Sequence, residues 1–107
     1  MNLSDKIYIA GSNGMVGSAV VRKLQAEGFT NLITKSSKEL DLTIQIEVAD
    51  FFEIEKPDYV FMAAAKVGGI LANNTFRAQF LFENLMIQNN VIHQSYLNNV
   101  KNLMFFG

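Results

Sequence analysis

The sequence has 107 residues, of which half are hydrophobic and 18% are charged, and its formal net charge is −1. This length and composition predict one globular domain with a single core. Scattered cations argue against a nucleic-acid partner, and the lack of cysteine excludes disulfides, thiolate metal sites and thiol nucleophiles.

Strand and helix patterns alternate along the chain. Short β-prone runs predict the strands, and apolar residues at helical spacing predict the helices between them. Thr43 is expected to cap the second helix, which Lys56 and Pro57 end. In chain order we expect a strand at 6–10, a helix at 15–27, a strand at 31–35, a very short strand at 39–41, a helix at 43–55, a strand at 59–63, a loop at 66–74, a helix at 76–98 and a strand at 102–106.

This alternation predicts an α/β fold of the Rossmann type. The sheet is expected to be parallel with strand order 3-2-1-4-5, because right-handed crossovers place a helix between neighbouring parallel strands. No repeat or linker divides the chain, so residues 1–107 are assigned to one dinucleotide-binding unit. Because the last strand leaves a sheet edge without a neighbour, we expect the N-terminal part of a domain truncated after its fifth strand.

A glycine-rich turn follows the first expected strand. Gly11, Gly14 and Gly17 are three residues apart where the strand passes into the helix. The first glycine permits a tight turn, the second lets the backbone approach a diphosphate, and the third lets helix and strand pack closely. Free N–H groups and the helix dipole then face the anion. The turn therefore predicts dinucleotide binding, against the alternative of a purely structural turn.

The end of the second strand indicates which dinucleotide is bound. An acid at this point would accept hydrogen bonds from the ribose 2′-hydroxyl of NAD. Residues 35–38 instead read Lys-Ser-Ser-Lys, whose cations and hydroxyls suit a 2′-phosphate, so NADP is favoured. Glu39 leaves NAD as an alternative, and a plain solvated loop is the other interpretation of this segment.

The glycine spacing resembles that of the short-chain dehydrogenase/reductases, and a second motif narrows the resemblance. Residues 63–70 read Ala-Ala-Ala-Lys-Val-Gly-Gly-Ile, and Asn73-Asn74-Thr75 follow. With the turn, the Glu-Leu-Asp-Leu segment at 39–42 and Asn84, these residues resemble the GDP-L-fucose synthases of the NAD-dependent epimerase/dehydratase family. The resemblance covers the whole chain. It implies an NADPH-dependent 3,5-epimerase and 4-reductase that makes GDP-fucose from GDP-4-keto-6-deoxymannose.

The same resemblance assigns residues to NADP. The glycine turn would hold the diphosphate, residues 36–38 would meet the 2′-phosphate, and residues 41–42 would flank the adenine. The three alanines would pass beneath the ribose, and the last strand would border the nicotinamide. The assigned residues are Gly11, Ser12, Asn13, Gly14, Met15, Val16, Gly17, Ser36, Ser37, Lys38, Asp41, Leu42, Ala63, Ala64, Ala65, Phe106 and Gly107.

The resemblance places no catalytic residue within these 107 residues. In the family a catalytic serine follows the position of Gly107, and a Tyr-x-x-x-Lys helix whose tyrosine donates a proton lies further on. A cysteine and a histidine perform the epimerisation, whereas this chain has no cysteine and His93 lies in no matching motif. We expect cofactor binding without turnover, with a GDP-sugar bound only by a full-length protein. The alternatives are a non-catalytic NADP-binding module or part of another nucleotide-sugar epimerase or dehydratase.

The long helix carries more apolar residues than one stripe against a sheet would use. By resemblance its outer face is a candidate homodimer interface, and the alternative is that further parts of the same subunit cover it. Residues 59–65 form the longest apolar run, well short of the about 20 residues of a membrane span. The polar N-terminus lacks a signal-peptide core. We expect a cytoplasmic protein that does not bind a membrane.

Overall fold

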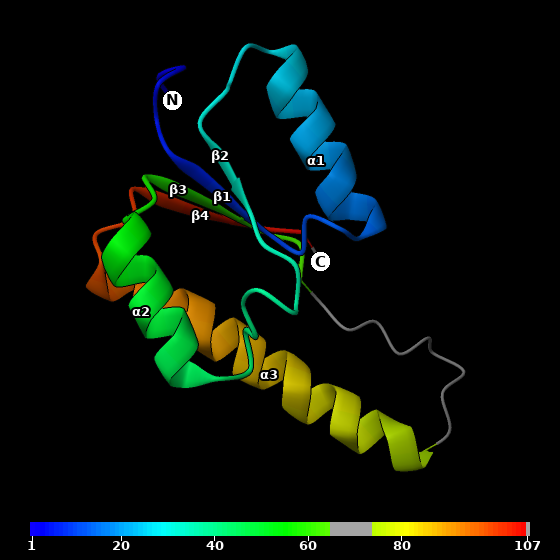
Figure 1. Ribbon diagram of the computed structural model, residues 1–107. Helices are drawn as coiled ribbons and strands as arrows, with labels where there is room; N and C mark the ends of the chain where they lie inside the picture. The colour runs from blue at the N-terminus through cyan, green and yellow to red at the C-terminus, as the bar shows by residue number, and fades with distance from the viewer. Residues whose placement is uncertain (65–73, 107) are drawn as a thin grey trace.

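The computed structural model describes residues 1–64 and 74–106. Helices and strands alternate along the chain as the sequence predicts, and the strands lie side by side in the middle of the molecule (Figure 1). The elements are β1 (Ile7–Ala10), α1 (Met15–Ala26), β2 (Leu32–Thr34), α2 (Gln45–Glu55), β3 (Tyr59–Met62), α3 (Asn74–Leu97) and β4 (Asn102–Phe105). The expected loop at 66–74 lies largely outside the described residues.

The sheet is parallel, with strand order β2-β1-β3-β4. In its register, Tyr8 of β1 lies opposite Ile33 of β2 on one side and Val60 of β3 on the other. The predicted α/β class and parallel sheet are confirmed. The predicted five-strand order is not, because the sheet lacks the short strand expected beyond β2.

Residues 36–40 form a turn, and no strand occurs at residues 39–41. The backbone N–H of Glu39 donates to the carbonyl of Ser36 at 3.0 Å, and that of Leu40 donates to the same carbonyl at 2.9 Å. The turn thus engages N–H groups that a strand would direct toward its neighbour. The side chain of Leu40 is buried in the core, so this segment is held by packing and local hydrogen bonds.

Helices cover both faces of the sheet, with α1 on one face and α2 and α3 on the other (Figure 1). Successive residues of β1 alternate between them. Ile7 and Ile9 pack toward α1, whereas Tyr8 and Ala10 pack toward α2 and α3. All four are buried, as expected for a parallel strand covered on both faces. The α1 core also contains Leu24, Phe29 and Phe61, and the α2/α3 core also contains Leu40, Val48, Phe51, Phe52, Val60, Met62, Ile87 and Val91.

The ends of α1 and α2 agree with the sequence prediction, whereas the start of α2 differs from it. Gly28, with φ of +97°, follows the end of α1, and Lys56 ends α2 in the left-handed region with φ of +46°. Thr43 does not cap α2, whose N-cap is Ile44. Its hydroxyl instead donates to Asp41 Oδ1 at 2.6 Å, within a turn that precedes the helix. The predicted cap is therefore wrong because Thr43 lies one residue before the N-cap, in a turn closed by Asp41.

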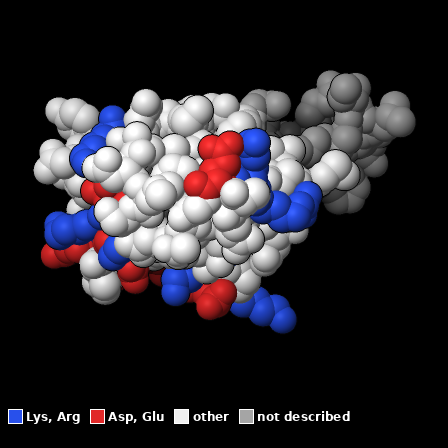
Figure 2. Space-filling model, turned by 90° about the horizontal axis from the view of Figure 1, so that it is seen from above, with Lys and Arg blue, Asp and Glu red and all other residues white. Residues whose placement is uncertain are grey.

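The surface combines dispersed charge with exposed apolar residues. Lysines, arginines and acids are interspersed on the face shown in Figure 2. On α3, a stripe at helical spacing stays exposed and consists of Leu81, Leu85, Ile92 and Tyr96. Across residues 1–64 and 74–106, none of the helices has the length and apolar character needed to cross a membrane.

Candidate functional site

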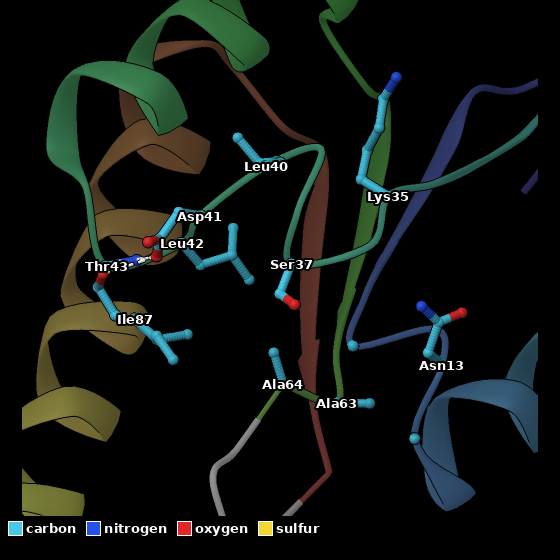
Figure 3. Close-up of a pocket in the computed structure, with 12 residues that line it drawn as sticks. Asn13, Lys35, Ser37, Leu40, Asp41, Leu42, Thr43, Ala63, Ala64 and Ile87 are labelled. Carbon is cyan, nitrogen blue, oxygen red and sulfur yellow. Dashed lines mark hydrogen bonds between the residues drawn. The ribbon is translucent and has the colours of Figure 1, made fainter.

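An open cavity of about 520 Å³ lies at the carboxyl ends of β1, β2 and β3 (Figure 3). This is the edge at which open parallel sheets bind ligands. Ser37, Leu42 and Ile87 point toward its middle, from the β2 end, the segment before α2 and helix α3. The lining residues are Gly11, Asn13, Gly14, Lys35, Ser37, Leu40, Asp41, Leu42, Thr43, Ala63, Ala64 and Ile87.

Two glycines of the turn are required by the fold itself. Gly11 has φ of +82°, and a Cβ there would lie 2.6 Å from the backbone nitrogen of Ala64. A Cβ on Gly17 would lie 1.9 Å from the carbonyl oxygen of Gly11. Both contacts are far shorter than van der Waals distance and involve backbone atoms. Gly11 thus brings the turn against the end of β3, and Gly17 brings helix α1 against the turn.

Gly14 differs from these two because nothing inside the described protein requires a glycine there. Its φ of −79° and ψ of 174° are open to any residue. Among the described atoms, a Cβ would meet only the carbonyl oxygen of Gly11, at an ordinary 3.5 Å. Gly14 nevertheless lines the cavity at the N-terminus of α1. The described protein atoms thus give no reason for a glycine at this position of the cavity.

The N-terminus of α1 itself suits an anion. Gly14 is its N-cap residue, no side chain of the described chain caps it, and no acid occupies its first turn. The first N–H groups of a helix have no partner within the helix and carry the positive end of its dipole. An anion above Gly14 would therefore meet both hydrogen-bond donors and a favourable field.

The end of β2 brings a cation and a hydroxyl to the cavity. Half-buried Lys35 and exposed Ser37 both line it. Glu39 is not among the lining residues, because its carboxylate accepts a hydrogen bond from the Ser36 N–H at 2.9 Å. This bond, together with that from the Ser36 side chain, lowers the pKa of Glu39. Glu39 is thus ionised at neutral pH and occupied in closing the turn.

Residues 40–43 form the wall opposite the glycine turn. Asp41 Oδ1 accepts hydrogen bonds from the Thr43 backbone N–H at 3.0 Å and from the Thr43 hydroxyl at 2.6 Å. These bonds are drawn as dashed lines in Figure 3. From α3, the side chain of Asn90 donates to the carbonyl of Leu42 at 2.9 Å. The wall is therefore shaped by its own turn and attached to a helix from a distant part of the sequence.

The structure brings eight of the seventeen assigned residues to this cavity. They are Gly11, Asn13, Gly14, Ser37, Asp41, Leu42, Ala63 and Ala64. Ala65 and Gly107 lie outside the described residues. The other seven do not line the cavity, and they are Ser12, Met15, Val16, Gly17, Ser36, Lys38 and Phe106. Cofactor contact by any of the seventeen stays a prediction.

The structure describes the surroundings of two of these seven, Met15 and Phe106. Met15 is 90% exposed at the start of α1 and does not line the cavity. Phe106 stacks on Phe61 with ring centroids 5.9 Å apart. Its N–H donates to the carbonyl of Met62 and extends the pairing of β3 with β4.

Four lining residues were not among those assigned, namely Lys35, Leu40, Thr43 and Ile87. Lys35 belongs to the segment whose charge favoured NADP, and Leu40 and Thr43 flank the assigned pair at 41–42. Their position next to assigned residues could therefore have predicted that they line the cavity. The sequence offered no such indication for Ile87, because the face of a helix that meets a cavity depends on how the helix packs.

Comparison with known proteins identifies the family to which this chain is similar. The model of the NAD dependent epimerase/dehydratase family matches residues 7–107. GDP-L-fucose synthase 1 of Arabidopsis thaliana is 61% identical over 104 residues, which are 97% of this chain and 32% of the plant protein. The chain thus spans about a third of the length of the curated relatives it matches.

Two solved structures from Campylobacter jejuni share this fold closely. A GDP-mannoheptose C4 reductase with NADP bound is 57% identical with a TM-score of 0.95, over 100% of this chain and 34% of that one. A GDP-D-glycero-L-gluco-heptose synthase, determined in the presence of NADPH, is also 57% identical with a TM-score of 0.95. In that comparison the match covers 100% of this chain and 31% of the other.

Proposed function

Because this chain belongs to the NAD-dependent epimerase/dehydratase family, we propose that it is the NADP-binding part of a GDP-L-fucose synthase-like enzyme. Residues 1–107 would form the N-terminal part of the dinucleotide-binding domain. The observation that carries the proposal is Gly14, which lines the cavity and has no internal reason to be glycine. A bound diphosphate supplies that reason, since it needs the space a Cβ would fill.

The cavity suits each part of an NADP molecule. The turn at Gly11 and Gly14 would hold the diphosphate through backbone N–H groups and the α1 dipole. The wall at Asp41 and Leu42 would flank the adenine on the opposite side. Lys35 and Ser37 would meet the 2′-phosphate, as an ammonium and a hydroxyl can both donate hydrogen bonds to it.

Two observations favour NADP over NAD. Glu39, the acid that left NAD open, accepts its hydrogen bond from Ser36 and is not among the cavity residues. The reductase from Campylobacter jejuni, 57% identical, has NADP bound. We therefore propose that this chain discriminates the two cofactors at the end of β2.

When bound, the reduced cofactor would supply the hydride for reduction of a 4-keto sugar. This sequence contains no Tyr-x-x-x-Lys segment and no cysteine. We therefore propose that the 107 residues bind and orient the cofactor, in the cytoplasm, and do not by themselves reduce or epimerise a sugar. A GDP-sugar would bind only to a full-length protein.

Calorimetric titration of the chain with NADPH and with NADH tests the cofactor assignment. We expect tighter binding of NADPH. Lys35→Gln should weaken NADPH binding by roughly three- to tenfold, the effect of losing one charge-assisted hydrogen bond, and leave NADH binding unchanged. Lys38→Gln is the variant for comparison, because it removes the same charge from the second lysine of the segment, which is exposed and does not line the cavity.

The outcomes separate the parts of this proposal. If neither cofactor binds, the proposal that this chain carries a cofactor site is wrong. Equal affinity for the two cofactors would exclude recognition of the 2′-phosphate. If Lys38→Gln has the larger effect, the phosphate lies toward residue 38 and away from Lys35.

A GDP-heptose reductase is a second candidate, favoured by the 57% identity to the two heptose enzymes. Both candidates would use the cofactor site in the same way, so the present cavity does not separate them. The measurement that does is NADPH oxidation by a full-length protein given GDP-4-keto-6-deoxymannose or a GDP-4-keto-heptose. Turnover of the heptose alone would replace the fucose assignment.

We also propose that the exposed stripe of α3 forms a homodimer interface. Leu81, Leu85, Ile92 and Tyr96 lie on one side of the helix, away from buried Ile87 and Val91. Burial of exposed apolar side chains of a helix is a common way for two chains to pair. The alternative is that further parts of the same subunit cover it.

A further inference from the structure

Asn90 joins helix α3 to the wall of the cavity. Its side-chain nitrogen donates to the carbonyl oxygen of Leu42 at 2.9 Å, across 48 positions of sequence. Asn90 is half-buried and follows Ile87 by almost one helical turn, so both lie on the side of α3 that faces the wall. One residue thus lines the cavity, and the other holds the segment that lines it.

Residues 40–43 belong to no helix or strand, and at one end of the wall Leu40 is buried in the core. The Asp41–Thr43 hydrogen bonds fix the shape of the turn. They leave open where the turn stands relative to the glycine turn across the cavity. The bond from Asn90 acts on that position, because α3 packs against the same core as β1 and β3.

We propose that Asn90 is a positioning residue that sets the place of the Asp41–Leu42 wall and thereby the affinity for the adenosine half of the cofactor. This inference rests on the proposed function. A partly buried carbonyl that loses its donor turns toward another partner or toward water. Because Leu42 carries both this carbonyl and a side chain that lines the cavity, the wall would move with it.

The test is calorimetric titration of two Asn90 variants with NADPH, NADH and 2′-phospho-ADP-ribose, which lacks the nicotinamide. Asn90→Asp replaces the donor with a carboxylate facing a carbonyl oxygen, and its Kd should rise roughly tenfold for all three ligands. Asn90→Ala removes the donor without adding charge, and we expect a rise of roughly threefold. Asn89→Asp is the control, since it makes the same change on the neighbouring exposed residue.

Two readouts distinguish positioning from a merely structural role. Loss of folded protein lowers the number of binding sites per chain, whereas a displaced wall raises the Kd of sites that remain. The NADPH-to-NADH affinity ratio should also stay constant, because both cofactors share the adenosine. A lower site number at unchanged Kd, or an effect on NADPH alone, would overturn the inference.

The failure of this inference is distinct from that of the proposed function. If the unchanged chain binds NADPH and both Asn90 variants bind it equally well, Asn90 does not position the wall. If the unchanged chain binds no cofactor, the proposed function itself is wrong, and the inference falls with it.

Discussion

At the scale of single residues, the glycine turn separates what the fold requires from what a ligand would require. Gly11 and Gly17 are fixed by backbone contacts within the protein, since a Cβ at either would collide with backbone atoms. Gly14 has an ordinary backbone conformation and space around it. The motif thus contains two structural glycines and one that faces the cavity. Substitutions at Gly14 and Gly17 can test this distinction.

We predict that Gly14→Ala impairs NADPH binding but not stability, whereas Gly17→Ala lowers the stability of the fold. Gly14→Ala should change the free energy of unfolding by less than about 0.5 kcal/mol and weaken NADPH binding at least roughly tenfold. Gly17→Ala should cost roughly 3 kcal/mol, the upper range for overpacking, because its Cβ would lie 1.9 Å from the Gly11 oxygen. Thermal denaturation and calorimetric titration check the pair. Unimpaired NADPH binding by Gly14→Ala would remove the main support for a diphosphate at this turn.

The burial of Tyr8 should make the stability of the fold depend on pH in the alkaline range. The ring of Tyr8 packs against those of Phe51 and Phe52, with centroids 4.6 Å and 6.0 Å away. Burial in this core raises the pKa of Tyr8 well above its usual value. Above about pH 10 the unfolded chain therefore loses the Tyr8 proton while the folded chain keeps it. Stability contributed by Tyr8 is present below pH 10 and is lost as the pH rises beyond it.

We therefore predict that Tyr8→Phe flattens the alkaline limb of the stability profile. Between pH 10 and 11 the free energy of unfolding of the unchanged chain should fall more steeply than that of the variant. The difference should approach about 1.4 kcal/mol per pH unit, the value for one proton. Urea denaturation at several pH values measures both slopes. Parallel slopes would mean that Tyr8 already ionises in the folded protein.

At the scale of elements, sequence patterns predict most of the fold because the patterns are local. The strands at 7–10, 59–62 and 102–105 and the helices fall within a few residues of their expected ends. The short strand expected at 39–41 is wrong because Ser36 and Glu39 close a turn through both backbone and side chain. Such reciprocal bonds compete with sheet pairing over so short a segment.

In the candidate site, too, local sequence predicts some residues, whereas others depend on how the helices pack. Residues that adjoin a strand end, such as Gly11, Ser37 and Ala64, reach the cavity as expected, because parallel strands bring their carboxyl ends to one edge. Ile87 and Asn90 come from α3, and the sequence alone does not indicate which side of that helix meets the wall. Their contribution depends on the packing of α2, α3 and the sheet, which is a property of the whole fold.

At the scale of the whole molecule, apolar surface remains on one side of α3. The inner side of this helix supplies Ile87 and Val91 to the core, while its exposed stripe lies on the opposite side. Leu85 is 47% exposed and Ile92 is 40% exposed, so a large part of each apolar side chain is in contact with water. Burying the stripe against a second copy of the chain would remove its apolar side chains from water.

We predict that the chain is a dimer at micromolar concentration and that Leu85→Glu with Ile92→Glu makes it monomeric. Placing unpaired carboxylates in an apolar interface should weaken association by at least roughly a hundredfold. Ile46→Glu with Ile54→Glu is the control, since it changes two exposed isoleucines of α2 in the same way. Sedimentation velocity measures all three proteins. A monomeric unchanged chain would favour the alternative, in which further parts of the same subunit cover the stripe, because a surface that pairs two copies needs no additional residues to do so.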